Sequence, residues 1–412
     1  MDSRSPARGL VVLTFAMALS QFFRSCLAVM APELQHDLQL SPAGFGTLSS
    51  CFFLAFGLAQ IPVGIAFDRF GVGAPTRLLL ALGTVSASLF VVAPNGATAM
   101  LAQAGLGLAC APIFMGLMHY ASEKLPPQRY PDFITRANGV GMLGALCATA
   151  PLGWAVHVFG WRASLALPAF CMGVACVAVW RNVRDHGHAE ARRESPARML
   201  HASIRLLARP ALWTLIPMCM AMAAGTTFRN AWGGPYLASV FGLSAGARGA
   251  ALAALSVGAF CAAMALPWLL RRWSMRSTVL GWTCVSLACG LALSLFPAAQ
   301  LWPDLALLTM LATLGVLHPL VMGHARQLLE PAMRGRGLGL LNTFVFLGSA
   351  ITAWAFGLIA NAGQIANTAA AATYGRIFGL AAALALLGLL AYVFSPGMAP
   401  VVPRAGSQAE AR

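Results

Sequence analysis

The sequence predicts an all-α membrane protein with twelve transmembrane helices arranged as two pseudo-symmetric six-helix bundles. Three observations predict it. Of the 412 residues, 59% are hydrophobic and only 9% are charged, whereas a soluble domain carries roughly 25% charged residues. Apolar runs of membrane-spanning length recur along the chain, and polar signatures of the first half return in the second. A surface with so few charges must face lipid over most of its area.

The first half contains six apolar runs of the roughly 17–25 residues that a helix needs to cross the hydrocarbon layer. These runs lie at 9–32, 43–67, 78–94, 97–121, 134–158 and 163–181. The first run follows Arg4 and Arg8, as the apolar core of a signal peptide would. It is longer than such a core and many further runs follow it, so we interpret it as an uncleaved helix.

The second half contains six further runs, at 211–234, 249–270, 277–297, 304–325, 337–360 and 376–395. We therefore predict one bundle over 1–181 and another over 211–395. The polar stretch 182–210 between them is predicted to be a cytoplasmic linker, and 396–412 a cytoplasmic tail. Three histidines of the linker could hold a metal, but a solvated linker is the favoured interpretation: His186, His188 and His201.

The basic residues predict the orientation. Twenty-one of the 27 lie on one side of the predicted spans and three lie within spans. Only Arg162, Arg248 and Arg376 fall on the other side. Because cytoplasmic loops are enriched in Lys and Arg, both termini should lie in the cytoplasm of a bacterium, with the chain in the inner membrane. The net charge of +15 then reflects membrane topology, and we expect no binding of nucleic acid.

The two halves repeat each other. Phe23-Arg24-Ser25 returns 205 positions later as Phe228-Arg229-Asn230. The other repeated signatures, at nearly the same spacing, are Leu40-Ser41 with Leu243-Ser244, Gly46 with Gly249, Pro112 with Pro319 and Gly116 with Gly323. Several matches in order, near half the chain length, indicate a duplication of the kind that many transporters contain.

No catalytic or cofactor signature is present. The ten cysteines are scattered without the paired spacing of a metal site or a disulfide framework, so we expect no metal and no cofactor. The sequence lacks HExxH, GxSxG and Walker A motifs, which argues against an enzyme and against ATP hydrolysis. A receptor built on a transporter scaffold is a third class, but it would normally add a signalling domain.

The segment from Gly64 to Gly71 reads GIAFDRFG. It resembles the G-x-x-x-D-R-x-G signature between helices 2 and 3 of the major facilitator superfamily. The resemblance implies a twelve-helix carrier that works by alternating access, with this loop latching the two halves on the cytoplasmic side. The gating residues that it implies are Gly64, Asp68, Arg69 and Gly71, with Arg334 and Arg336 as counter-charges. Alternatively, Asp68 and Arg69 are only interfacial charges.

The chain departs from the family pattern in helices 4 and 8. The loop after helix 8, over 267–274, lacks the acid, and Gln103 stands where many relatives have an arginine. Helix 5 loosely resembles the antiporter motif of drug exporters, although a Pro-kinked packing helix is an equal alternative. Its relevant residues are Gly141, Gly144, Pro151 and Gly153.

Arg24 and Arg229 are the strongest functional candidates. Each lies deep within its predicted span, where an arginine costs from about 2.5 to more than 10 kcal/mol. They occupy matching positions of the repeat, and none of the twelve acids lies at mid-span. Two such guanidinium groups would clamp a carboxylate or a phosphate. The pair resembles the arginines of organophosphate/phosphate antiporters and related organic-anion carriers. The alternative is that each side chain snorkels to the membrane surface.

Further substrate contacts are expected around this pair. The candidates are Gln21, His119, Asn230, Trp232, Tyr236 and Asn342. Trp232 and Tyr236 could instead belong to an interfacial aromatic belt. Arg326 should form a local ion pair with Glu330 one turn later. Coupling through anion exchange, through a protonated substrate, or through His119, His318 or His324 stays open.

Together these features predict a secondary active transporter for a small anionic organic solute, a carboxylate or a phosphate ester. The alternative is an efflux carrier for a drug, a siderophore or another metabolite. The expected partners are the small-molecule substrate, a counter-anion or a proton, and the lipid bilayer. We expect a monomer.

Overall fold

The computed structural model describes residues 4–183, 204–330 and 333–396. All regular elements in these ranges are helices, as the composition predicts. Most of the predicted linker, including His186, His188 and His201, and nearly all of the predicted tail lie outside the described residues.

The described part of the N-terminal half, from residue 4 onward, contains seven helices. They are α1 (Arg4–Ser25), α2 (Leu27–Asp37), α3 (Pro42–Phe70), α4 (Gly73–Val91), α5 (Gly96–Lys124), α6 (Tyr130–Cys147) and α7 (Ala150–Asn182). Side-chain oxygens cap two of these helices, since Ser41 Oγ accepts from the Gly44 amide and Asn95 Oδ1 accepts from the Thr98 amide. Such caps satisfy amides that have no partner within the helix.

The C-terminal half is more broken. It contains η2 (Leu206–Ala208), α9 (Pro210–Trp213), α10 (Ile216–Ala221), α11 (Ala223–Thr227), the π-turn η3 (Phe228–Trp232), α12 (Gly233–Phe241), α13 (Ala245–Leu270), α14 (Met275–Leu295), α15 (Leu301–Ala312), η4 (Thr313–Leu317), α16 (His318–Leu328), α17 (Arg334–Ile365) and α18 (Ala370–Val393). The predicted spans at 211–234 and 304–325 are therefore chains of short helices.

The described helices provide twelve crossings. Ten continuous helical segments are long and apolar enough to span a membrane, and the pair α1 and α2, bent by 51°, adds an eleventh. One of the ten, 130–182, has 53 residues, or about 80 Å of helix, more than twice the hydrocarbon thickness. It breaks at Gly160, whose φ of 77° favours glycine. This segment therefore supplies two crossings, which confirms the predicted fold.

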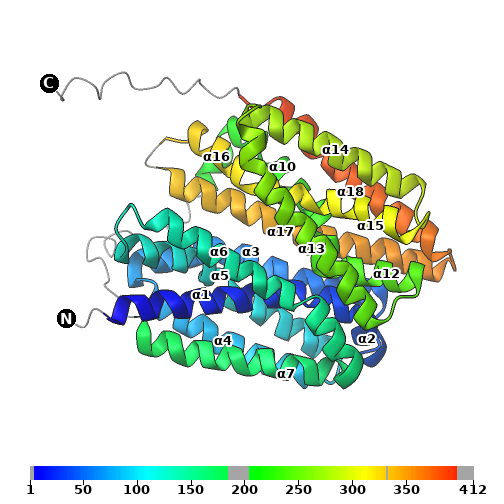
Figure 1. Ribbon diagram of the computed structural model, residues 1–412, viewed down its shortest axis with the longest axis horizontal. Coiled ribbons are helices and arrows are strands. Elements are labelled where there is room, and N and C mark those ends of the chain that lie inside the picture. The colour runs from blue at the N-terminus through cyan, green and yellow to red at the C-terminus, as the bar shows by residue number, and fades with distance from the viewer. Residues whose placement is uncertain (1–3, 184–203, 331–332, 397–412) are drawn as a thin grey trace.

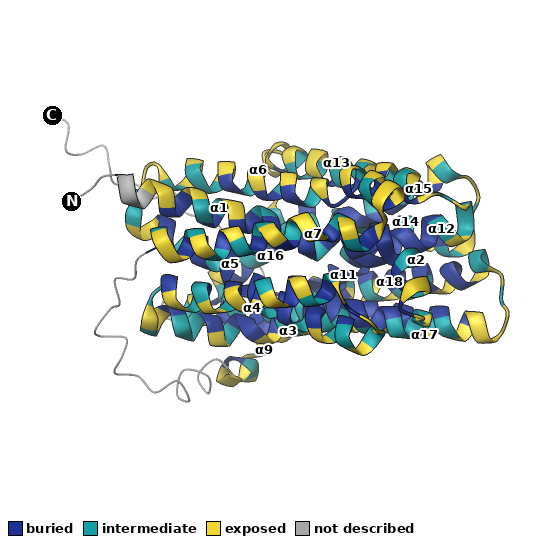
Figure 2. Cartoon of the chain, turned by 90° about the horizontal axis from the view of Figure 1, so that it is seen from below, coloured by how far each residue is buried: buried dark blue, intermediate teal, exposed yellow. Residues whose placement is uncertain are grey.

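The outer faces of the helices suit lipid. Large apolar side chains such as Leu78, Phe170 and Leu295 are at least 70% exposed, and Figure 2 shows exposed residues along the outside of the bundle with buried residues between the helices. A water-soluble monomer rarely exposes so much contiguous apolar surface. The chain is therefore a multi-pass membrane protein.

The two halves lie side by side along the length of the molecule (Figure 1). We call the end that carries the α3–α4 and α5–α6 connections the terminal end, because α1 begins there. We call the opposite end, with Asp37 and Gly160, the distal end. The halves pack together through α3 against α17 and through α7 against α13.

Two glycine pairs bring the halves into backbone contact near the distal end. A Cβ built on Gly46 of α3 would lie 2.8 Å from the Gly357 Cα of α17, and one built on Gly153 of α7 would lie 2.9 Å from the Gly249 Cα of α13. Gly46 and Gly249 are partners in the sequence repeat. The duplication has therefore produced the same contact twice, once on each side of the interface.

Candidate functional site

A cavity of about 920 Å³ lies between the halves. It extends from Arg24 and Arg229 towards the terminal end, where Asp68, Tyr130 and Arg336 line its mouth. The glycine pairs close the interface on the distal side. The described chain thus has a central chamber with access from one end.

Both arginines lie where their helices are irregular. Arg24 is the residue before the last of α1, next to the 51° bend. Arg229 lies within the π-turn η3, a type of distortion that often marks functional sites. Immediately after them, Ser25 Oγ donates a hydrogen bond to Asn230 Oδ1 at 3.2 Å. The matching segments of the repeat therefore meet at the floor of the cavity.

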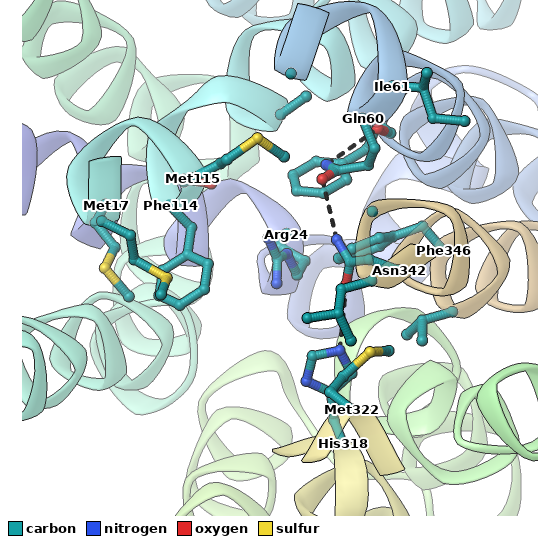
Figure 3. Close-up of a pocket in the computed structure, with 18 of the residues that line it drawn as sticks. Met17, Arg24, Gln60, Ile61, Phe114, Met115, His318, Met322, Asn342 and Phe346 are labelled. Atoms are coloured by element: carbon teal, nitrogen blue, oxygen red, sulfur yellow. Dashed lines mark hydrogen bonds between the residues drawn. The ribbon is translucent and has the colours of Figure 1, made fainter. Parts of the chain in front are cut away.

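The Arg24 guanidinium lies beside two aromatic rings that contact each other, with their centroids 4.1 Å apart. Its central carbon is 4.8 Å from the ring centroid of Phe56 on α3 and 5.1 Å from that of Phe346 on α17. Figure 3 shows Arg24 beside Phe346 at the centre of the pocket. Because the negative faces of aromatic rings attract cations, the two halves hold this guanidinium jointly. Its N–H edges are left to meet a ligand.

The two guanidinium groups have no protein counter-ion within the described part of the chain. The Nε atoms of Arg24 and Arg229 are buried without a hydrogen-bond partner there. The ion pairs formed by described residues involve other side chains. The deep end of the cavity is therefore positively charged.

A chain of three side chains crosses the cavity. His318 Nε2 lies 3.2 Å from Asn342 Oδ1, and Asn342 Nδ2 donates to Gln60 Oε1 at 3.0 Å (Figure 3). Gln60 in turn donates to the Phe56 carbonyl at 3.4 Å. These bonds link α16 and α17 of one half to α3 of the other.

The structure places four of the six expected additional contacts at the cavity. Gln21, His119, Asn230 and Asn342 line it together with the two arginines. His119 also lies 3.1 Å from Glu123.

Trp232 and Tyr236 lie away from the cavity. Trp232 packs edge-on against Phe45 and Phe356, and Tyr236 donates to Asp304 at 2.6 Å. Both are fully buried, so they are not exposed belt residues either. They follow Arg229 on the distal side, where neighbouring helices close over the chain.

Three of the six expected gating residues line the cavity, and three do not. Gly64, Asp68 and Arg336 line the cavity, with Arg336 on the half opposite to the other two. Arg69 stacks near Phe70 at 5.5 Å, and Gly71 ends α3 with a φ of 76° that favours glycine. Arg334 Nε donates to the carbonyl oxygens of Arg326 and Leu329, so this arginine fixes the start of α17.

One interpretation of a charged residue was wrong. Glu330 pairs with Arg209 at 3.0 Å, not with Arg326, because the helix ends at Leu328 and the i, i+4 geometry is lost. Arg248 lies in the first turn of α13, at the distal end. It is 4% exposed and donates to both carboxylate oxygens of Glu33 and to the Val29 carbonyl. These bonds join α13 to α2 across the distal interface.

Sequence reasoning missed Gln60, Phe56 and Phe346. Gln60 had a usable signal, since a lone amide in an apolar span usually finds a partner on another helix. The two phenylalanines had none, because phenylalanine is abundant in this chain and only the packing brings these two rings to Arg24.

Comparison with known proteins gives a consistent result. A family model described as Major Facilitator Superfamily matches residues 13–353. The probable nitrate/nitrite transporter NarK2 of Mycobacterium tuberculosis is 25% identical over 316 residues, which are 76% of this chain and 79% of that protein. The probable galactarate/D-glucarate transporter GudP of Escherichia coli is 27% identical over 169 residues, 39% of this chain and 38% of that protein. The hexuronate transporter of Bacillus subtilis is 21% identical over 197 residues, 48% and 46% of the two chains.

Solved structures share the fold. The nucleoside transporter NupG superposes with a TM-score of 0.74 at 11% identity, covering 95% of this chain and 98% of that one. A bacterial homolog of the human lysosomal transporter Spinster, in an inward-facing and occupied conformation, gives 0.73 at 15% identity, covering 96% and 97%.

Proposed function

This chain belongs to the major facilitator superfamily, and from that premise we propose that it is a secondary transporter for a small organic anion, a carboxylate or a phosphate ester, in the bacterial inner membrane. The observation that carries the proposal is the pair Arg24 and Arg229, which line one cavity without a protein counter-ion among the described residues. An anionic cargo would provide that counter-ion.

The energetics favour this assignment. Burying an arginine in a membrane protein costs several kcal/mol unless something pairs with it. The rings of Phe56 and Phe346 lie together on one side of the Arg24 guanidinium, so its donors on the other side can form a bidentate contact with a carboxylate. Neutralising both arginines would lower the cost of closing the cavity around the substrate.

The relatives support an anion, since their names refer to nitrate and nitrite, hexuronate, and galactarate and D-glucarate. The efflux alternative rested on the helix 5 glycines. A Cβ on Gly141 would contact Met17, one on Gly144 would overlap the Ala18 carbonyl, and Gly153 meets Gly249. These glycines have a packing role that explains their presence without an exporter motif.

The proposed mechanism is alternating access by the bundles 1–181 and 211–395, acting as a monomer. The distribution of basic residues supports a cytoplasmic terminal end, and the described conformation would then be open inwards. The outward-open state would require separation of the distal glycine pairs and of Glu33 from Arg248. Asp68 and Arg336, which line the mouth from opposite halves, would change their contacts as the inner side closes. A counter-anion or a proton would provide the coupling.

Transport by purified protein in liposomes tests the proposal. We expect uptake of radiolabelled anions from a panel of nitrate, D-glucuronate, glycerol 3-phosphate and aliphatic and aromatic carboxylates, and no uptake of choline. Arg24→Gln and Arg229→Gln should each lower the rate at least tenfold, because one lost charge-assisted contact is worth about 1.5–3 kcal/mol. Arg376→Gln, which changes an exposed arginine of α18, is the matched control. Unchanged rates in both cavity variants would rule out the anion clamp.

A further inference from the structure

We infer that the anion accepted by this cavity has an apolar body, such as that of an alicyclic, aromatic or aliphatic monocarboxylate, and is not a polyhydroxylated sugar acid. This inference rests on the proposed function, because Arg24 and Arg229 supply the anionic contact. The chemistry of the remaining body follows from the rest of the cavity wall.

Methionines form much of that wall. Five of them line the cavity, from α1, α5, the junction of α10 and α11, and α16: Met17, Met115, Met118, Met222 and Met322. Figure 3 shows three of these, Met17, Met115 and Met322, around the space in front of Arg24. Thioether side chains are apolar and adapt to ligands of different shape. They offer almost nothing to a hydroxyl group.

Aromatic rings complete the apolar surface. Phe114 and Phe346 lie on opposite sides of Arg24 in Figure 3, and Phe53 and Phe56 also line the cavity. A carboxylate at the arginines would therefore carry its body between phenyl rings and thioethers. The volume of about 920 Å³ lies at the upper end of the roughly 300–1,000 Å³ of small-molecule sites, so an inorganic oxyanion alone would leave most of the cavity unused.

The deep polar side chains are largely occupied with each other or with their own helices. His318, Asn342 and Gln60 bond in series, and Asn230 accepts from Ser25. The hydroxyl groups of two further lining residues donate to carbonyls one turn earlier: Thr226 to Met222 at 3.1 Å and Ser349 to Val345 at 3.1 Å. These groups have hydrogen-bond partners without a ligand.

The hydroxyl groups of a sugar acid would find few hydrogen-bond partners in this cavity. Each hydroxyl loses its water on entering the cavity and must find a protein partner to offset that loss. The bonded groups described above could serve a hydroxyl only by sharing or breaking these bonds, which leaves Gln21 and Asn138 as the lining amides without such a bond within the described part of the chain. An apolar body needs no such partner, and it gains from leaving water. The cavity of this chain therefore differs from what the names of the hexuronate and glucarate transporters among its relatives would lead one to expect.

Binding to the purified protein, measured by calorimetry at pH 7, tests the inference with matched ligands. Cyclohexanecarboxylate and D-glucuronate each combine a six-membered ring with one carboxylate, and they differ mainly in the hydroxyl groups. We expect cyclohexanecarboxylate to bind at least tenfold more tightly, about the effect of one unpaired hydroxyl. Binding is preferable to flux, because a protonated apolar acid can cross lipid unaided. Cyclohexanemethylamine provides the cation control.

The outcomes separate the two claims. Equal or tighter binding of D-glucuronate, lost in Arg24→Gln, would overturn the apolar body and leave the anion carrier intact. Binding of the amine as tightly as the acids, or of neither acid, would overturn the anion site and this inference with it.

A variant gives a second test. Met115→Gln should shift the preference several-fold towards D-glucuronate, because it adds an amide to the wall, whereas Met115→Leu should keep the wild-type preference. Thermal unfolding of both variants in detergent checks that they fold. An unchanged preference in a folded Met115→Gln protein would contradict the inference.

Discussion

At the scale of single residues, the central feature is a cation held by aromatic rings from both halves of the protein. Phe56 belongs to α3 and Phe346 to α17, and their ring centroids are 4.1 Å apart beside Arg24. Movement of one half relative to the other must change this arrangement. The environment of the proposed binding group therefore depends on the conformation of the whole transporter.

Removing one ring should weaken anion binding without abolishing it. A cation–π contact is worth about 0.5–2 kcal/mol, so Phe346→Leu should raise the Kd for cyclohexanecarboxylate roughly two- to thirtyfold. Calorimetry on the purified protein measures this. Phe260→Leu, at a partly exposed position of α13, is the control and should bind as the wild type does. Wild-type affinity in Phe346→Leu would show that the rings do not position Arg24.

At the scale of helices, α2 connects the floor of the cavity to the distal interface. It continues α1 beyond the 51° bend that follows Arg24. Asp37 at its end bonds within its own half, to Trp161 at 2.9 Å and to Arg162 at 2.8 Å. Glu33, one turn earlier, bonds instead to Arg248 of the other half. The same short helix is thus tied to both bundles.

Removing the Glu33–Arg248 ion pair, which joins α2 to α13, should open the distal side. Glu33→Gln would leave the buried guanidinium of Arg248 without its counter-charge, so this substitution should favour conformations in which α2 leaves α13. We expect an impermeant maleimide to label Cys26, which is fully buried at the bend, at least tenfold faster in a background without the other cysteines.

The matched control is Asp37→Asn, which removes an ion pair inside one half and should leave labelling of Cys26 near the wild-type rate. Equal acceleration by both substitutions would indicate general loosening of the helix and would contradict a specific role of Glu33 and Arg248 in distal closure.

At the scale of the whole molecule, the duplication explains how the halves fit together. Gly46 meets Gly357 and Gly249 meets Gly153, so one contact of the ancestral repeat appears twice. Small residues allow membrane helices to approach closely. Such contacts can also separate and re-form, since they contain few polar bonds.

A larger residue in place of either Gly46 or Gly249 should disrupt the distal interface to a similar extent. Gly46→Val and Gly249→Val each place a side chain against backbone less than 3 Å away, so both should force the distal interface apart and increase Cys26 labelling by similar factors. Gly246→Val, one turn from Gly249 at a position where a Cβ would meet no atom within 4 Å, should label as the wild type does. A large effect of one glycine and none of the other would contradict the symmetric interface.

The sequence by itself determined the membrane class, the positions of twelve spans, the duplication and the two buried arginines. These features follow from local properties: the length of apolar runs, the scarcity of charge and the recurrence of short patterns. None of them depends on knowing how helices rotate against each other.

Only the tertiary structure decided which polar groups meet. Gln60 and Asn342 are 282 positions apart, and Glu33 and Arg248 are 215 apart, so no local pattern links them. The same holds for Trp232 and Tyr236, which share a span with Arg229 yet face away from the cavity. The rotation and depth of a helix are set by its packing against distant segments, and they determine whether a side chain meets substrate, protein or lipid.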